Sequence, residues 1–273
     1  MELLAWLAAA VAVAVLAVVV WSVAKRGASQ LNIDLLTKTP VSFALGPVKQ
    51  GLANAFVGSL IIVGLATAMA LPVGILVAIY VNEFAPRTVR MGVSLALDVL
   101  NGIPAIVIGI FVFGLLVVAH GQSAYAGAFA LAVLMLPLVA RATIEVLALV
   151  PNSLREASLG LGVPRWRTTL GIVLPQTVGG IVTGAVLAVA RVAGETAPLL
   201  FTSSIVGNEI DTNPSHALQT VPVAIFELSE QADPADHARA WAAALVLLLF
   251  ILCASLSARW LATRSRRKLG RVG

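Results

Sequence analysis

The chain has 273 residues, of which 59% are hydrophobic and only 11% are charged, and its mean hydropathy is +0.98. These values exclude an ordinary soluble domain and indicate an integral membrane protein. The net charge of +5 is no sign of nucleic-acid binding. The basic residues gather in segments that we expect at one membrane face, whereas the segment Thr202–His237, expected at the other face, is acidic.

Apolar runs long enough to cross a membrane occur six times. A helix needs about 20 apolar residues to cross about 30 Å of hydrocarbon. The runs of this length are Leu3–Val23, Ala55–Val81, Met91–Ala119, Ala124–Leu149, Ile172–Phe201 and Ala240–Leu261. Because backbone groups in lipid must be hydrogen-bonded within the chain, we predict an all-α membrane protein with six transmembrane helices. The first run lacks the basic residues that precede a secretory signal, so we expect it to be an uncleaved helix.

The runs divide the chain into a first transmembrane helix with an external linker at residues 1–50, one helical membrane domain at 51–262, and a basic tail at 263–273. The positive-inside rule predicts that both termini are cytoplasmic. The expected inner side then holds Arg87, Arg90, Arg155, Arg165, Arg167, Arg259, Arg264, Arg266, Arg267, Lys268 and Arg271, and the outer side holds Lys25, Arg26, Lys38, Lys49 and Arg239. Lys25 and Arg26, directly after the first span, argue for the opposite orientation, and the other basic residues outweigh them.

Ionisable residues within the predicted spans are candidate substrate contacts. Such a residue costs roughly 2.5–3.5 kcal/mol at a helix centre, so it tends to persist where it is paired or faces a cavity. Arg191 and Glu195 are four residues apart and are predicted to share a helix face. Arg141 and Glu145 repeat this spacing, and Asp98 lies in the third run. An Arg guanidinium binds tetrahedral oxyanions through paired hydrogen bonds; the alternative is an Arg–Glu pair that only fixes helix packing.

A short polar segment at residues 156–175 interrupts the apolar runs and reads EASLGLGVPRWRTTLGIVLP. We predict a short helix at 151–161 with Asn152 or Ser153 as its N-cap residue. Gly162 is predicted to end this helix in a sharp turn with little room for a side chain. A short helix across the end of a membrane bundle offers a surface that another protein can move.

Other features carry less information. The external stretch Leu218–Leu228 is too short to cross a membrane, and we expect either a helix buried beneath an external loop or a gating or docking element. Cys253 is the only cysteine, which excludes an intramolecular disulfide. His120, His216 and His237 lack the spacing of metal ligands.

The spacing of the polar segment resembles the EAA loop of binding-protein-dependent ABC importer permeases, which reads Glu-Ala-Ala, three residues, Gly, nine residues and then Ile-x-Leu-Pro. Ser158 stands at the second Ala. The resemblance implies a type I ABC importer permease fold, in which this loop forms a cytoplasmic coupling helix that docks on a separate ATPase. The residues that it assigns to ATPase coupling are Glu156, Ala157, Gly162 and Arg165.

Three further segments resemble PstA-type permeases, the phosphate-specific subunits of this importer class. Ala190–Phe201 reads ARVAGETAPLLF and is similar to the ARxAGETAPLLF segment, Asn101–Gly109 resembles the proline-containing third helix, and Ala78–Phe84 resembles the end of the second helix. The resemblance implies phosphate as the substrate and a path formed by Arg191, Glu195, Arg141 and Asp98. Counting about 1.5 Å per residue along the helices, we expect phosphate to reach Arg191 first and Arg141 nearer the exit.

The resemblance also implies partners: a second permease of the PstC type, an ATPase homodimer of the PstB type and an external phosphate-binding protein of the PstS type, at a bacterial inner membrane. The chain contains no Walker A motif, G-x-x-x-x-G-K-[ST]. We therefore expect a non-catalytic subunit without a cofactor of its own, with ATP and Mg²⁺ bound by the partner ATPase.

Two other transport functions fit parts of the sequence. A permease of the same class could carry another oxyanion, such as molybdate, sulfate or phosphonate. An ion-coupled secondary transporter would also place Arg and carboxylate groups within helices, and Pro72, Pro104 and Pro198 could supply its broken helices; such a protein has no use for an EAA loop. A membrane enzyme is disfavoured, because no histidine lies clearly within a predicted span.

Overall fold

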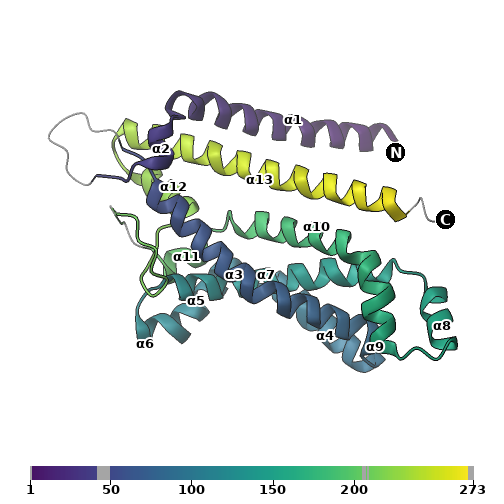
Figure 1. Cartoon of the computed structure of the whole chain (residues 1–273). Helices are drawn as coiled ribbons and strands as arrows, with labels where there is room; N and C mark the ends of the chain where they lie inside the picture. Colours follow the sequence, from purple (N-terminus) through teal and green to yellow (C-terminus); the bar gives the residue numbers. More distant parts are fainter. Residues whose placement is uncertain (1, 42–49, 205–206, 208, 270–273) are drawn as a thin grey trace.

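The computed structural model describes residues 2–41, 50–204, 207 and 209–269, and these residues form helices without any strand (Figure 1). Residues 42–49 of the predicted linker, with Lys49, and residues 270–273 of the tail, with Arg271, lie outside the described residues. The helices are α1 (Glu2–Gly27), η1 (Ala28–Gln30), α2 (Ile33–Thr37), α3 (Ala53–Ile79), η2 (Tyr80–Phe84), α4 (Arg87–Gly102), α5 (Ala105–Val112), η3 (Phe113–Val117), α6 (Val118–His120), α7 (Ala124–Ala148), α8 (Asn152–Gly160), α9 (Arg165–Thr168), η4 (Thr169–Val173), α10 (Leu174–Val192), α11 (Ala197–Thr202), α12 (Val221–Glu230) and α13 (Pro234–Leu269).

Long apolar helices confirm the prediction of an all-α membrane protein. Five helical stretches are long and apolar enough to cross a membrane, and the bent pair α4–α5 brings the number to six if it counts as one span. The five stretches are Glu2–Gln30, Ala53–Phe84, Ala124–Ala148, Arg165–Val192 and Pro234–Trp260. The start of α1 and the end of α13 lie at the same end of the bundle as α8 (Figure 1).

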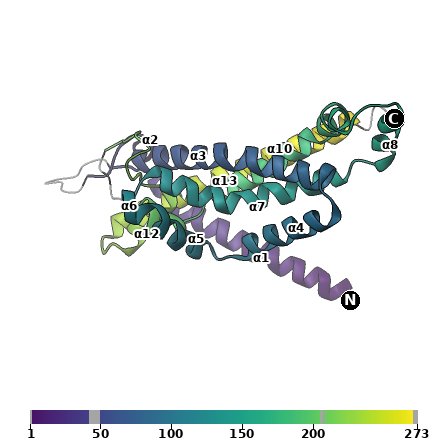
Figure 2. The ribbon, with the colours of Figure 1, turned by 90° about the horizontal axis from the view of Figure 1, so that it is seen from below.

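Helices α3 and α7 run side by side through the centre of the bundle (Figure 1, Figure 2). Small buried residues on both helices, such as Ala66, Ala70, Ala124 and Ala128, let the two backbones approach closely. Pro72 lies within α3, which continues through it, so the suggestion of a helix break at Pro72 is wrong. This pair forms the rigid centre on which α10, α11 and α12 pack.

The third apolar run is not a straight span. The prediction of one helix over Met91–Ala119 is wrong, because α4 and the helical segment from Ala105 to His120 meet at 95°. Pro104 lacks an N–H group and holds the preceding Ile103 in an extended conformation, which ends α4. Helix α5 then packs on α11, where a Cβ atom on Gly109 would lie 2.6 Å from Pro198 Cα.

The fifth apolar run is also interrupted. A continuous helical stretch runs from Arg165 to Val192, so it begins earlier and ends earlier than the predicted span Ile172–Phe201. Residues 193–196 form a break, and α11 follows in a new direction (Figure 1). The free-energy cost of this break is lowered by small residues such as Gly194 and by Pro198, which favours the start of a helix.

Short helices close the end of the bundle that lies opposite α8. Helix α12 packs against α13 and α3, and Val223 and Ala224 are fully buried. The Ser59 hydroxyl accepts a hydrogen bond from Val221 N at 2.8 Å, which fixes the start of α12. The stretch Leu218–Leu228 thus contains a helix whose first turn is buried, and its expected gating or docking role stays a prediction.

Helix α1 lies at the side of the bundle against α13 (Figure 1). The Arg26 guanidinium stacks over the Trp241 ring at 4.8 Å, and Gly27 allows the two backbones to approach closely. The remaining apolar surface of α1 faces away from the bundle. Lipid is the natural solvent for such a helix.

Candidate functional site

The predicted coupling helix is present as α8 (Asn152–Gly160). The expectation that Asn152 or Ser153 is its N-cap residue is wrong: Pro151 occupies that position, and its fixed backbone angle suits the start of a helix without a side-chain hydrogen bond. The predicted end at Gly162 is confirmed. Gly162 N donates to Leu159 O at 2.9 Å and Val163 N donates to Ser158 O at 3.2 Å, the two bonds of a Schellman motif.

Gly162 has a positive φ of 78°, so the sharp turn is confirmed. The expectation of little room for a side chain is wrong, because a Cβ atom on Gly162 would meet nothing within 4 Å. Glycine suits this position because of its backbone angle alone.

Most of α8 and the following turn is exposed at the end of the bundle. Glu156, Ala157 and Arg165 are exposed, and the side chain of Leu161 is 84% exposed. The small Ser158 is buried, and its hydroxyl lies 2.8 Å from that of Thr168 on α9. The predicted coupling residues therefore surround an accessible surface that combines charged and apolar groups, a composition suited to docking another protein.

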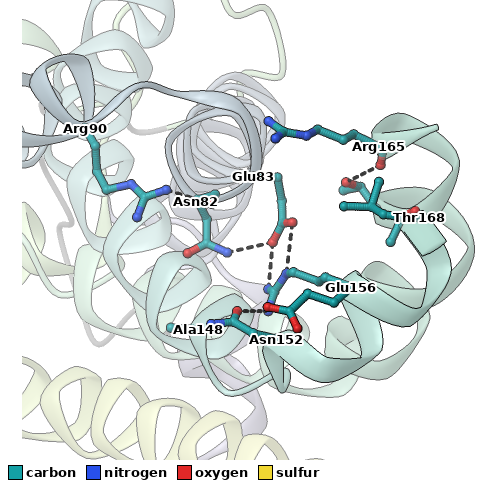
Figure 3. Close-up of a pocket in the computed structure, with 11 residues that line it drawn as sticks. Asn82, Glu83, Arg90, Ala148, Asn152, Glu156, Arg165 and Thr168 are labelled. Atoms are coloured by element: carbon teal, nitrogen blue, oxygen red, sulfur yellow. Dashed lines mark hydrogen bonds and ion pairs between the residues drawn. The ribbon is translucent and has the colours of Figure 1, made fainter. Parts of the chain in front are cut away.

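A cavity of about 410 Å³ lies between α8, α9 and η2 (Figure 3). Glu83 on η2 reaches across it to Arg155 on α8 (Figure 3), with Arg155 Nη2 at 2.8 Å from Glu83 Oε1 and Arg155 Nε at 3.1 Å from Glu83 Oε2. Asn82 donates to the same carboxylate at 2.7 Å. Arg90 donates to Val81 O at 3.0 Å and to the Asn82 carbonyl at 3.1 Å.

Arg141 and Asp98, both predicted for the substrate path, form an ion pair between α7 and α4. Arg141 Nη2 also donates to Ser94 O at 2.6 Å. The Arg141 Nε atom is buried and has no hydrogen-bond partner among the described residues. The Asp98 side chain is 65% exposed, so the pair lies at the edge of an accessible region. Glu145, four residues after Arg141, is exposed.

Arg191 and Glu195 do not share a helix face, contrary to the prediction. Helix α10 ends at Val192, and Glu195 lies in the break before α11. The break is formed by tight turns, in which Gly194 N donates to Arg191 O at 3.3 Å and Glu195 N donates to Val192 O at 3.1 Å. Within the described part of the chain no ion pair joins Arg191 to Glu195, and the Arg191 residue is exposed.

The two arginines lie at different levels of the bundle. Helix α7 runs towards α8, and Arg141 lies seven residues before its end at Ala148. Helix α10 runs away from α8, and Arg191 lies in its last turn. Arg141 is therefore nearer to the end that carries α8, and Arg191 is nearer to the opposite end.

The opposite end carries a polar cluster around Glu227 of α12. Gln219 Nε2 donates to Glu227 Oε2 at 2.6 Å and Asn54 Nδ2 donates to Gln219 Oε1 at 2.8 Å. Burial raises the pKa of the Glu227 carboxyl above its ordinary value, and the hydrogen bonds from Gln219 and Ser204 oppose this shift. This cluster was not predicted from the sequence, because it includes Asn54, which lies 165 residues before Gln219.

Over residues 70–267 the sequence matches the family described as the binding-protein-dependent transport system inner membrane component. The chain belongs to this family. Relatives and solved structures of the same kind support the assignment, and they are similar to this permease over most of its length.

Among curated proteins, this permease is 41% identical over 225 residues to the phosphate transport system permease protein PstA 1 of Mycobacterium tuberculosis, a match that covers 80% of this chain and 72% of that protein. It is 38% identical over 245 residues to the phosphate transport system permease protein PstA of Haemophilus influenzae, with coverage of 88% and 85%.

Among solved structures, the permease resembles the inward-facing MetNI methionine ABC transporter with a TM-score of 0.60 at 16% identity, over 78% of this chain and 93% of that one. It also resembles a bacterial ABC transporter involved in the import of alginate, with a TM-score of 0.57 at 18% identity over 76% and 79% of the two chains. At these identities the likeness shows the fold, and it confirms the predicted type I importer permease architecture.

Sequence reasoning identified the exposed residues of the permease loop but missed the polar contacts behind it. Arg155 precedes Glu156 directly, and Glu83 belongs to the segment Ala78–Phe84 that resembles the end of the second PstA helix. Both signals were visible in the sequence. Their connection was not, because 72 residues separate Glu83 from Arg155.

Proposed function

We propose that this permease forms half of the translocation pathway of an ATP-driven phosphate importer in the bacterial inner membrane, with both termini in the cytoplasm. The observation that carries the proposal is the identity of 41% and 38% to two proteins named as PstA phosphate transport permeases. The position of α8 and both chain ends at one end of the bundle supports the orientation (Figure 1).

The arginines supply chemistry that suits phosphate. An Arg guanidinium offers paired N–H donors that match two oxygens of a tetrahedral anion. Arg141 has a buried Nε without a partner among the described residues, and its present counter-ion, Asp98, is mostly exposed. Phosphate arriving at Arg141 would displace the Asp98 carboxylate, and this competition keeps binding weak enough for release.

Arg191 is the outer contact in this proposal, because it lies in the last turn of α10, away from the coupling end. Phosphate would be released by an external binding protein of the PstS type, meet Arg191 first, and pass Arg141 on its way to the cytoplasm. Glu195, in the break beside Arg191, would neutralise the empty path.

Energy for transport would come from outside this chain. A homodimeric ATPase of the PstB type, which binds ATP and Mg²⁺, would dock on the exposed residues Glu156, Ala157, Gly162 and Arg165. A second permease of the PstC type would form the other half of the pathway. Closure of the ATPase dimer would move α8 and switch the bundle between inward-open and outward-open states.

The test is uptake of radiolabelled phosphate by proteoliposomes that contain the assembled transporter. We expect Arg191→Gln to abolish uptake while the complex still assembles. Arg191→Lys should also lose most of its uptake, because an ammonium lacks the planar fork of a guanidinium. The charge exchange Arg191→Glu with Glu195→Arg should not restore uptake, since no ion pair joins the two residues. Near-normal uptake by Arg191→Gln would refute the proposed role of Arg191 in the phosphate path. Preferential uptake of molybdate, sulfate or phosphonate would show that this oxyanion, and not phosphate, is the substrate.

A further inference from the structure

The Arg155 side chain is the most fully bonded group at the coupling end. A guanidinium has five N–H donors, and all five are used here. Two bonds go to the Glu83 carboxylate, at 2.8 and 3.1 Å. The other three go to Val150 O at 2.6 Å, Leu147 O at 2.9 Å and Asn152 Oδ1 at 3.3 Å. Such saturation fixes the side chain in one position.

The pair is also shielded from solvent. The side chains of Glu83 and Arg155 are 8% and 17% exposed, although they lie at one end of the helix bundle. Low exposure strengthens a bidentate ion pair and makes the loss of one partner costly, because the other charge remains unpaired. Glu156, the next residue along α8, lines the same cavity but is exposed to solvent.

The acceptors of Arg155 belong to separate helices. Leu147 is in the last turn of α7, where the last carbonyls of a helix have no partner within it, and Val150 lies in the short connection from α7 to α8. Glu83 belongs to η2, the continuation of α3, and Arg90 holds the carbonyls of Val81 and Asn82 at the same point. One side chain on α8 thus bonds both to the last turn of α7 and to η2, which continues α3. Figure 3 shows Glu83, the acceptor on η2.

We infer that the Glu83–Arg155 ion pair is the rigid link through which the coupling helix moves α3 and α7 together. The inference rests on the proposed function, and it makes Arg155 and Glu83 positioning residues. Without the pair, α8 would keep its chain connections at 149–151 and 161–164, the bonds from Arg155 to the Leu147 and Val150 carbonyls, and the Ser158–Thr168 hydrogen bond to α9, but it would lose its ion pair to η2. Because Arg141 lies on α7 only two turns before Leu147, a displacement of α8 reaches it along one continuous helix.

A role limited to folding makes a different prediction from a role in transmission. If the pair only stabilises the fold, its removal should lower the amount of complex, and the complex that remains should couple normally. If the pair transmits motion, the assembled complex should be defective. The two readings are separated by measurements made per assembled complex.

The experiment uses Arg155→Gln and Arg155→Lys in the full chain, with Arg87→Gln as the matched control, since Arg87 is exposed in the first turn of α4. The first measurement is amide hydrogen exchange of α8 in the purified chain, which requires no substrate. We expect exchange to accelerate about tenfold in both Arg155 variants and to remain unchanged in the control. Lysine should not rescue, because an ammonium cannot reach the carboxylate and both carbonyls at once.

The second measurement is the ratio of ATP hydrolysis with and without the phosphate-loaded external binding protein, in the reconstituted complex. We expect this ratio to fall about tenfold in Arg155→Gln, within the usual range of coupling between sites. Unchanged exchange of α8, or a ratio within twofold of that of the unaltered complex, would overturn the inference. If Arg155→Gln does not assemble, hydrogen exchange of α8 and the ATP hydrolysis ratio are measured in Glu83→Gln, and the same outcomes test the inference. Failure of the unaltered complex to transport phosphate would refute the proposed function, whereas the exchange result would still decide whether the pair holds α8.

Discussion

The backbone angle of Gly162 predicts that a glycine-to-alanine substitution destabilises the end of α8 at position 162 but stabilises it at position 160. Gly162 has a φ of 78°, and a Cβ atom there would meet no atom within 4 Å. Gly162→Ala should therefore cost only the backbone penalty of a left-handed residue, about 1–2 kcal/mol. Gly160 is the last residue of α8 and is equally free of neighbours. Gly160→Ala should stabilise the helix by at most about 0.5–1 kcal/mol, the value for a glycine in the middle of a helix, because alanine loses less conformational freedom.

Hydrogen exchange of the amides of Gly162 and Val163 measures the effect, since these two groups make the closing bonds of α8. A cost of 1–2 kcal/mol corresponds to exchange that is roughly 5 to 30 times faster in Gly162→Ala. Gly160→Ala should slow exchange, and Gly162→Asn should be close to the unaltered protein because Asn tolerates the left-handed region. Equal protection in the two alanine variants, or a larger loss in Gly162→Asn than in Gly162→Ala, would refute the reasoning.

Two further predictions concern the opposite end of the bundle. With Cys253 replaced by Ser, a cysteine at Ser215 should react with an impermeant maleimide on intact cells, whereas a cysteine at Ser153 on α8 should react only after permeabilisation; labelling of both from outside would contradict the proposed orientation. Burial raises the pKa of Glu227, so the folded chain holds this proton more tightly than the unfolded chain, and the resulting stability is lost as the pH rises from the ordinary value of 4.5 through the raised one. Glu227→Gln should flatten the pH dependence of the apparent melting temperature in this range, whereas the exposed Glu230→Gln should not; parallel curves would exclude Glu227 as its source.

Local patterns predicted the helices well and their breaks poorly. Hydropathy identifies an apolar run but does not distinguish a straight helix from two helices, because both bury the same residues in lipid. At Pro104 the break follows from the missing N–H group and could have been predicted. At residues 193–196 the spacing of Arg191 and Glu195 suggested a shared helix face, and only the packing of α11 on α5 and α7 shows that the chain turns there.

The candidate site was predictable where it depended on neighbours along the chain. The turn at Gly162 and the helix before it follow from residues 151–164 alone. The pairing of Arg141 with Asp98 joins residues from α7 and α4, and the pairing of Arg155 with Glu83 joins α8 to η2. Each partner is one of several carboxylates available to the arginine in the sequence. Tertiary packing selects among them, and no local pattern contains that information.

The contact between α1 and α13 bears on how the protein is made. Translation adds about 5–20 residues per second, and α1 ends at Gly27 whereas α13 begins at Pro234. The first helix therefore waits roughly 10–40 s in the membrane before its neighbour leaves the ribosome. During that interval Arg26 has no Trp241 to stack on. During this interval the stability of α1 in the membrane must depend on its own hydrophobicity.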